Sequence, residues 1–202
     1  MLDAGSGGPL ALYSPFVTAH QLPGPDVKTI QALGGAGAGG EVTGKLGRVA
    51  AFAIGPYTLT SPIAMFSEDK TGAFAATAIQ GNVGQPILSR FKLFFDYAHN
   101  RVIFEPTAAL AEPFDRAYSG LVIETEGADH KTFRITNILE NSPASEAGLQ
   151  KGDVITAVDA RTSADLTLTQ IFDLFEKVAT YKLTIRRGEQ TISVPLSPRK
   201  LV

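Results

Sequence analysis

Short apolar runs, many of them closed by glycine or proline, are the feature that most limits the fold of this chain. With 20 glycines and 12 prolines in 202 residues, turns recur too often for a helical bundle. The clearest pattern is a β-hairpin, in which residues 92–97 and 101–104 flank the turn His99-Asn100. We therefore expect a mainly β protein, all-β or α+β, whose 44% hydrophobic residues suffice for real cores.

Composition excludes several classes of function. A net charge of −2 argues against a nucleic-acid partner, which needs a basic surface. The absence of cysteine excludes disulfides and thiolate chemistry, and the three histidines lack the spacing of metal ligands. No apolar run is long enough to span a bilayer. We expect no metal site and no membrane-spanning segment.

A glycine-rich run at residues 34–40 formally satisfies the dinucleotide pattern GxGxxG. A dinucleotide site also needs a helix directly after the glycines, and residues 41–47 do not have a helical pattern. No Gly-Lys-Ser/Thr is present for a nucleotide-binding loop either. We expect no cofactor here, and the run fits a mobile hairpin or a plain flexible loop.

An acidic turn opens the chain. Asp3 follows Met1-Leu2 and precedes a run of small residues, Ala4-Gly5-Ser6-Gly7-Gly8. Small residues allow backbone amides to approach a carboxylate closely. Two interpretations are open: a solvated turn, or a functional acid in which Gly5 and Ser6 support Asp3.

The strand pattern lapses between residues 107 and 117. Pro106 directly precedes this segment, and an alanine-rich stretch and Pro113 lie within it. We predict a first domain at 1–106, a linker at 107–117 and a second domain at 118–200.

In the second domain, residues 142–149 read Ser-Pro-Ala-Ser-Glu-Ala-Gly-Leu and residues 152–155 read Gly-Asp-Val-Ile. This pattern and its spacing resemble bacterial PDZ domains, which are small β-barrels or sandwiches with two helices. The resemblance implies a loop that captures the terminal carboxylate of a peptide, and a strand edge that accepts the peptide as an added strand. The implied loop and strand residues are Ser119, Gly120, Leu121, Val122 and Ile123.

Thr167 and Gln170, three residues later, predict a capping box at the start of a helix, and this helix carries two apolar stripes at helical spacing. We assign one stripe to the peptide groove and the other to the core; the alternative is that all six residues are core. The groove stripe is Leu168, Phe172 and Phe175, and the core stripe is Ile171, Leu174 and Val178. Arg116 is either an aid to carboxylate binding or an exposed linker residue.

Three elements of the first domain occur in the order seen in a bacterial, PDZ-linked lobe of a retropepsin-like aspartic peptidase. They are the turn at 2–6, the glycine run in a flap-like position, and residues 81–91, similar to the element that supports the catalytic turn. The resemblance implies that Asp3 is the catalytic acid, supported by Gly5 and Ser6. It also implies a flap that contains Gly35, Gly37 and Gly39.

Aspartic peptidases need two carboxylates that share a proton, and this chain supplies one. The resemblance implies that the second comes from a preceding lobe or a homodimer mate, so that the chain looks like the C-terminal part of a two-lobed protein. The resemblance implies a hydroxyl at the position of Ala4 to brace the paired turns, and alanine cannot supply one. We carry two hypotheses: half of an aspartic peptidase whose PDZ domain selects substrates by their C-termini, or a non-catalytic peptide-binding scaffold. The resemblance alone suggests export to the periplasm.

Overall fold

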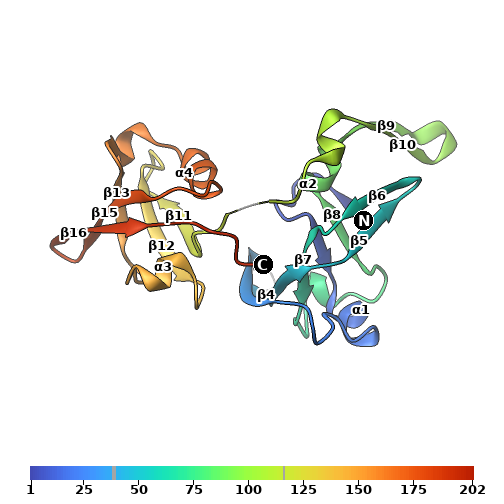
Figure 1. Ribbon diagram of the computed structural model, residues 1–202, viewed down its shortest axis with the longest axis horizontal. Helices are drawn as coiled ribbons and strands as arrows, with labels where there is room; N and C mark the ends of the chain where they lie inside the picture. Colours follow the sequence, from blue (N-terminus) through green and yellow to red (C-terminus); the bar gives the residue numbers. More distant parts are fainter. Residues whose placement is uncertain (38–39, 116) are drawn as a thin grey trace. The chain divides into compact units, whose positions relative to one another are not determined.

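The computed structural model describes residues 1–37, 40–115 and 117–202 (Figure 1). They form two compact units, which consist of Met1–Phe114 with Val202, and of Asp115–Leu201. The boundary lies inside the segment that we predicted as a linker. None of the described helices has the length and apolar character needed to cross a membrane.

The first unit contains a six-stranded sheet in the order β1-β8-β2-β7-β4-β3. β1 is parallel to β8 and β2 is parallel to β7, whereas the other neighbours are antiparallel. The strands are β1 (Leu2–Asp3), β2 (Leu10–Leu12), β3 (Ile30–Gly37), β4 (Gly40–Arg48), β7 (Ile63–Ser67) and β8 (Gly81–Gly84). The pairing of β1 with β8 places the acidic turn beside the segment that we expected to support it.

The glycine-rich run lies in the β3–β4 hairpin, where Gly35 pairs with Val42 and Gly37 with Gly40. Gly39 lies outside the described residues. The two strands of the expected hairpin are therefore present, one before and one after the residues that the structure does not describe.

Two further hairpins and two short helices complete the first unit. The hairpins are β5 (Ala51–Ile54) with β6 (Tyr57–Thr60), and β9 (Phe91–Asp96) with β10 (Arg101–Pro106). The helices are α1 (Ser14–Ala19) and α2 (Gln85–Leu88), and each has a proline in its first turn, where the missing N–H is no loss. The second hairpin confirms the clearest prediction from the sequence.

A buried arginine fixes the end of the first unit. The Arg90 guanidinium donates hydrogen bonds to the carbonyls of Ala109 (3.1 Å) and Pro113 (3.3 Å) and lies 3.7 Å from the centre of the Phe114 ring. Burial lowers the pKa of Arg90, and the nearby Glu112 carboxylate opposes that shift. Part of the predicted linker is therefore held by the first unit.

The second unit is an antiparallel sheet in the order β11-β12-β13-β15-β16, with β14 beside β13. Its strands are β11 (Leu121–Glu126), β12 (Thr132–Ile138), β13 (Val154–Val158), β14 (Arg161–Thr162), β15 (Tyr181–Arg187) and β16 (Gln190–Leu196). Its helices are α3 (Pro143–Glu146) and α4 (Leu168–Phe175) (Figure 1). Reciprocal hydrogen bonds confirm the predicted capping box of α4: Thr167 N donates to Gln170 Oε1 at 2.9 Å, and Gln170 N donates to Thr167 Oγ1 at 3.2 Å.

The core of the second unit joins the sheet to both helices. From α4, Ile171 and Phe175 lie in this core, and Phe175 packs against the Tyr181 ring. Val178 is 73% exposed because α4 ends at Phe175, so our assignment of Val178 to the core is wrong.

An ion pair between a buried aspartate and a part-exposed arginine stabilises the second unit. Both oxygens of the Asp153 carboxylate accept hydrogen bonds from Arg187 at 2.7 Å, and one also accepts the Gln150 amide at 2.9 Å. Burial acts to raise the pKa of Asp153, but the hydrogen bonds and the charge of Arg187 outweigh it and the pKa is lowered.

Candidate functional site

One edge of the second sheet is open. β11 pairs with β12 on one side, and within the described residues no strand pairs with its other side. α4 lies next to β11. An unpaired strand edge presents a row of backbone donors and acceptors, and this edge can therefore accept an added strand.

The loop before β11 has three consecutive carbonyls that are each held by a backbone amide. Arg199 N donates to the Tyr118 carbonyl at 3.3 Å, Ala144 N donates to the Ser119 carbonyl at 2.9 Å, and Leu139 N donates to the Gly120 carbonyl at 2.8 Å. In a planar trans peptide unit, the N–H points opposite to the C=O. The N–H groups of Ser119, Gly120 and Leu121 therefore point away from the partners that hold these carbonyls.

Two of these three amides have no partner within the described residues, and the third has only a local one. In the part of the chain that the structure describes, the amides of Ser119 and Gly120 donate no hydrogen bond, and Leu121 N donates a long one, 3.2 Å, to Ser119 Oγ. Buried amides usually have partners. Successive free amides form a nest that suits an anion such as a carboxylate.

Gly120 is required at its position by both conformation and space. Its φ is +82°, in the region that favours glycine, and a Cβ there would lie 2.1 Å from Ser142 Oγ. Ser142 itself is fully buried. Its hydroxyl donates to the Leu139 carbonyl at 2.6 Å and accepts the Ser145 amide at 3.3 Å. The loop is therefore packed directly on the residue that caps α3.

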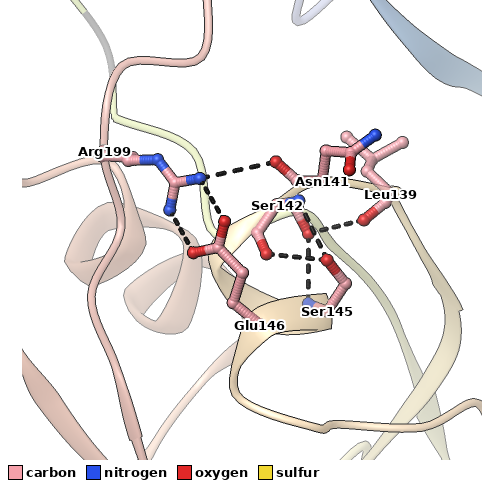
Figure 2. A network of polar contacts seen from close by, with 6 residues as sticks. All are labelled: Leu139, Asn141, Ser142, Ser145, Glu146 and Arg199. Atoms are coloured by element: carbon pink, nitrogen blue, oxygen red, sulfur yellow. Dashed lines mark hydrogen bonds and ion pairs between the residues drawn. The ribbon is translucent and has the colours of Figure 1, made fainter.

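Figure 2 shows the polar network behind the loop. Arg199 makes two hydrogen bonds of 2.7 Å to the Glu146 carboxylate, and its Nη2 donates to the Asn141 carbonyl at 3.5 Å. The hydrogen bonds from Arg199 lower the pKa of Glu146, and the same pair raises the pKa of Arg199. Since both side chains are exposed, the pair adds little to stability. It does connect α3 to the segment that holds the loop.

The side chains that we predicted to bind a peptide differ in their exposure to solvent. Leu121 and Val122 are half-buried, and Ile123 is in the core. On α4, Phe172 is 37% exposed whereas Phe175 is 3% exposed. Leu168 is partly buried against the core, and Arg116 lies outside the described residues.

Sequence reasoning missed Arg199, Leu139 and Ala144, which hold the carbonyls of the loop. Their contribution comes from backbone amides, and a backbone amide leaves no signal in residue type. The sequence shows an arginine at position 199, but no pattern in it indicates that this side chain pairs with Glu146.

In the first unit, the Asp3 carboxylate accepts two hydrogen bonds. Its Oδ1 accepts the Gly5 amide at 3.1 Å and its Oδ2 accepts Asn82 Nδ2 at 3.0 Å. Ser6 meets Asp3 through its backbone, with its amide 3.2 Å from the Asp3 carbonyl. Among the described residues, no second carboxylate hydrogen-bonds to this group. Asn82, on β8, is the partner that sequence reasoning missed.

Comparison with known proteins identifies the second unit. Residues 134–186 match the model of the PDZ domain family. This part of the chain is a PDZ domain. The chain is thus a mainly β protein with a PDZ domain in its C-terminal part, as the sequence predicted.

Two curated relatives and one solved structure are similar to parts of the chain. A probable CtpA-like serine protease of Staphylococcus haemolyticus is 31% identical over 99 residues, 48% of this chain and 20% of that protein. Serine protease HTRA1 of Xenopus laevis is 30% identical over 67 residues, 33% of this chain and 14% of that protein. The HtrA3 PDZ domain bound to a phage-derived ligand, FGRWV, is 20% identical with a TM-score of 0.37, and the match covers 42% of this chain and 85% of that chain.

These relatives correct our prediction of an aspartic peptidase. Both are serine proteases, which overturns the resemblance to a retropepsin-like lobe and the aspartic endopeptidase function, active or degenerate, that we based on it. The physical reason is that a short Asp-x-Gly turn is not specific. An Asp side chain that accepts the amide two residues later forms an Asx-turn, which occurs in many unrelated folds. The flap at Gly35, Gly37 and Gly39 was implied only by the same resemblance, so we do not propose it further.

The chain spans no more than a fifth of the length of either curated relative. A serine protease needs a serine hydroxyl activated by a base, usually a histidine oriented by a carboxylate. His99 contacts the Asp96 carboxylate at 2.8 Å. In the described part of the chain, however, no serine hydroxyl hydrogen-bonds to a histidine ring. The candidate functional site of this chain is therefore the loop and the open strand edge of the PDZ domain.

Proposed function

We propose that the PDZ domain, residues 118–200, binds the C-termini of other polypeptides. The last residues of the ligand add to the open edge of β11 as a strand, and the terminal carboxylate accepts hydrogen bonds from the amides of Ser119, Gly120 and Leu121. The observation that carries this proposal is the set of three held carbonyls, because they turn three adjacent amides away from the backbone groups that hold the loop. Two of these amides, of Ser119 and Gly120, donate no hydrogen bond among the described residues, and the third donates only to the nearby Ser119 hydroxyl.

Apolar C-terminal side chains are the ligands that we expect. α4 lies beside the open edge, and it presents the exposed ring of Phe172 and the partly buried Leu168. Phe175 is buried in the core, so the proposal does not use it as a peptide contact. A ligand side chain directed toward α4 would gain affinity by covering the Phe172 ring.

The similarity to serine proteases suggests how this binding is used. We infer that the domain selects protein ends for proteolysis, because both curated relatives are proteases. The inference concerns recruitment of substrates, and it assigns no catalytic residue to this chain.

The test is a titration of the full chain with one peptide in two forms. The pentapeptide FGRWV, the ligand named for the HtrA3 PDZ domain, is a suitable first probe, with either a free or an amidated C-terminus. Hydrogen bonds to a charged group are worth about 1.5–3 kcal/mol, so we expect the free acid to bind about 10- to 100-fold more tightly. Equal affinities for the two forms would refute carboxylate recognition.

Phe172→Ala is the matching variant for the apolar side of the site. It should weaken binding of the free acid without a large loss of stability, since the ring is part-exposed. Val178→Ala removes an exposed apolar side chain just beyond α4 and serves as the control. If both variants weaken binding equally, α4 does not provide the apolar contact.

A further inference from the structure

The three partners that hold the loop carbonyls differ in origin. Leu139 and Ala144 belong to the segment that runs from β12 into α3, directly behind the loop. Arg199 comes from the far end of the chain and forms an isolated antiparallel bridge with Tyr118. Tyr118 N donates to the Arg199 carbonyl at 2.9 Å, and Arg199 N returns a hydrogen bond to the Tyr118 carbonyl at 3.3 Å.

We propose that Arg199 is a positioning residue for the carboxylate-binding loop, an inference that rests on the function proposed above. The peptide unit between Tyr118 and Ser119 carries the first of the three amides. Because Arg199 N holds the carbonyl of this planar unit, it also fixes the direction of the Ser119 N–H. The ligand's carboxylate then meets an amide that is already oriented.

The side chain of Arg199 makes this hold rigid. Its guanidinium is bound through two 2.7 Å hydrogen bonds to Glu146, which lies on α3 (Figure 2). The same short helix contains Ala144, whose amide holds the Ser119 carbonyl. One ion pair therefore ties together the elements that orient the first and second amides, and bidentate geometry fixes an arginine more firmly than a single contact does.

Preorganisation is the physical effect of this arrangement. A loop that is ordered before binding loses less conformational entropy when the ligand arrives. The exposed ion pair adds little to the stability of the domain, so its removal should act mainly on the loop. The consequence is specific: recognition of the carboxylate weakens, whereas contacts along β11 and α4 do not.

The test compares the acid-to-amide affinity ratio of FGRWV in the full chain and in Arg199→Ala, Arg199→Lys and Glu146→Gln. We expect each variant to lower the ratio by about three- to tenfold, the effect of weakening one hydrogen bond, while affinity for the amidated peptide stays within about twofold. The double variant Arg199→Glu/Glu146→Arg, which restores an ion pair, should recover part of the ratio.

Arg134→Ala is the matched control. Arg134 makes a similarly exposed two-point pair with Glu126, at 2.6 and 2.8 Å, at the end of β11 opposite to the loop. Its removal should leave the ratio unchanged. An acid-to-amide affinity ratio that stays at the wild-type value in the Arg199 and Glu146 variants would overturn the positioning role. Parallel losses for acid and amide would also overturn it, because they indicate general destabilisation.

The wild-type chain separates the two proposals. If it binds the acid and the amide equally, the proposed function fails, and the role of Arg199 fails with it. If wild type prefers the acid and the variants retain that preference, only the inference about Arg199 fails.

Discussion

A single methyl group at position 120 tests the architecture of the loop. In Gly120→Ala the new Cβ would lie 2.1 Å from the hydroxyl oxygen of Ser142 and 2.2 Å from its Cβ. Real Cβ atoms essentially never approach other atoms within 3.0 Å, so the loop or α3 must move. Ser142 is fully buried and caps α3, which leaves it little room to yield.

Two terms add in this variant. A left-handed conformation costs a non-glycine residue about 1–2 kcal/mol, and overpacking a buried site costs about 1–3 kcal/mol. We expect Gly120→Ala to lower the free energy of unfolding of the second unit by about 2–5 kcal/mol, and to abolish detectable peptide binding. Urea denaturation, followed through NMR signals of the second unit, measures this loss separately from the first unit.

Gly148→Ala isolates the conformational term. Gly148 has a φ of +71°, and a Cβ there would meet nothing within 4 Å. Its replacement should cost only about 1–2 kcal/mol and leave peptide binding intact. If the two alanine variants lose equal stability, the close approach of Gly120 to Ser142 is not real, and our account of the loop is refuted.

Three further perturbations have defined outcomes. Asp153→Asn breaks the ion pair between the buried Asp153 and the part-exposed Arg187, and it should lower the free energy of unfolding by about 1–3 kcal/mol at neutral pH, measured by urea denaturation. Folding lowers the pKa of Asp153, so its contribution is complete above the unfolded pKa of about 4 and is lost as pH falls through the folded value; the gap between wild type and variant should close over that range. Phe175→Ala should cost about 3–5 kcal/mol because its ring is buried, whereas Phe172→Ala should cost far less and act on peptide affinity. Arg90→Ala removes the donor that holds the carbonyls of Ala109 and Pro113, and limited proteolysis should then cut the end of the first unit faster than in wild type.

Each of these predictions has an outcome that contradicts it. A constant gap between wild type and Asp153→Asn down to acidic pH would show that the carboxylate does not act through its charge. Equal losses of stability at positions 172 and 175 would contradict the exposure of the first ring. Unchanged cleavage of Arg90→Ala would mean that other contacts hold the segment.

Local chemistry in the sequence predicted much of the PDZ domain. Thr167 and Gln170, three residues later, predicted the start of α4 correctly, because a capping box acts within one turn. Helix length was less accurate: α4 ends at Phe175, earlier than its apolar pattern suggests, and Val178 is therefore exposed.

Long-range contacts account for what sequence reasoning missed. Arg199 contacts Tyr118 and Glu146, and Asn82 contacts Asp3, although the residues of each pair lie far apart in the sequence. No periodic pattern connects such residues. The aspartic peptidase prediction failed for a related reason: the turn at residues 2–6, the glycine run and residues 81–91 are each too short to identify a family, even when they occur in the expected order.

The open edge of β11 also bears on how the protein behaves at high concentration. Exposed strand edges are templates for edge-to-edge aggregation, and proteins protect them with charged residues and irregular pairing. β11 has both: a register shift between Val122 and Ile123, and two glutamates, Glu124 and Glu126. The edge is thus suited to a short peptide end but is a poor template for continuous growth with further copies. Replacing these glutamates with β-branched apolar residues would make the binding edge a nucleus for aggregation.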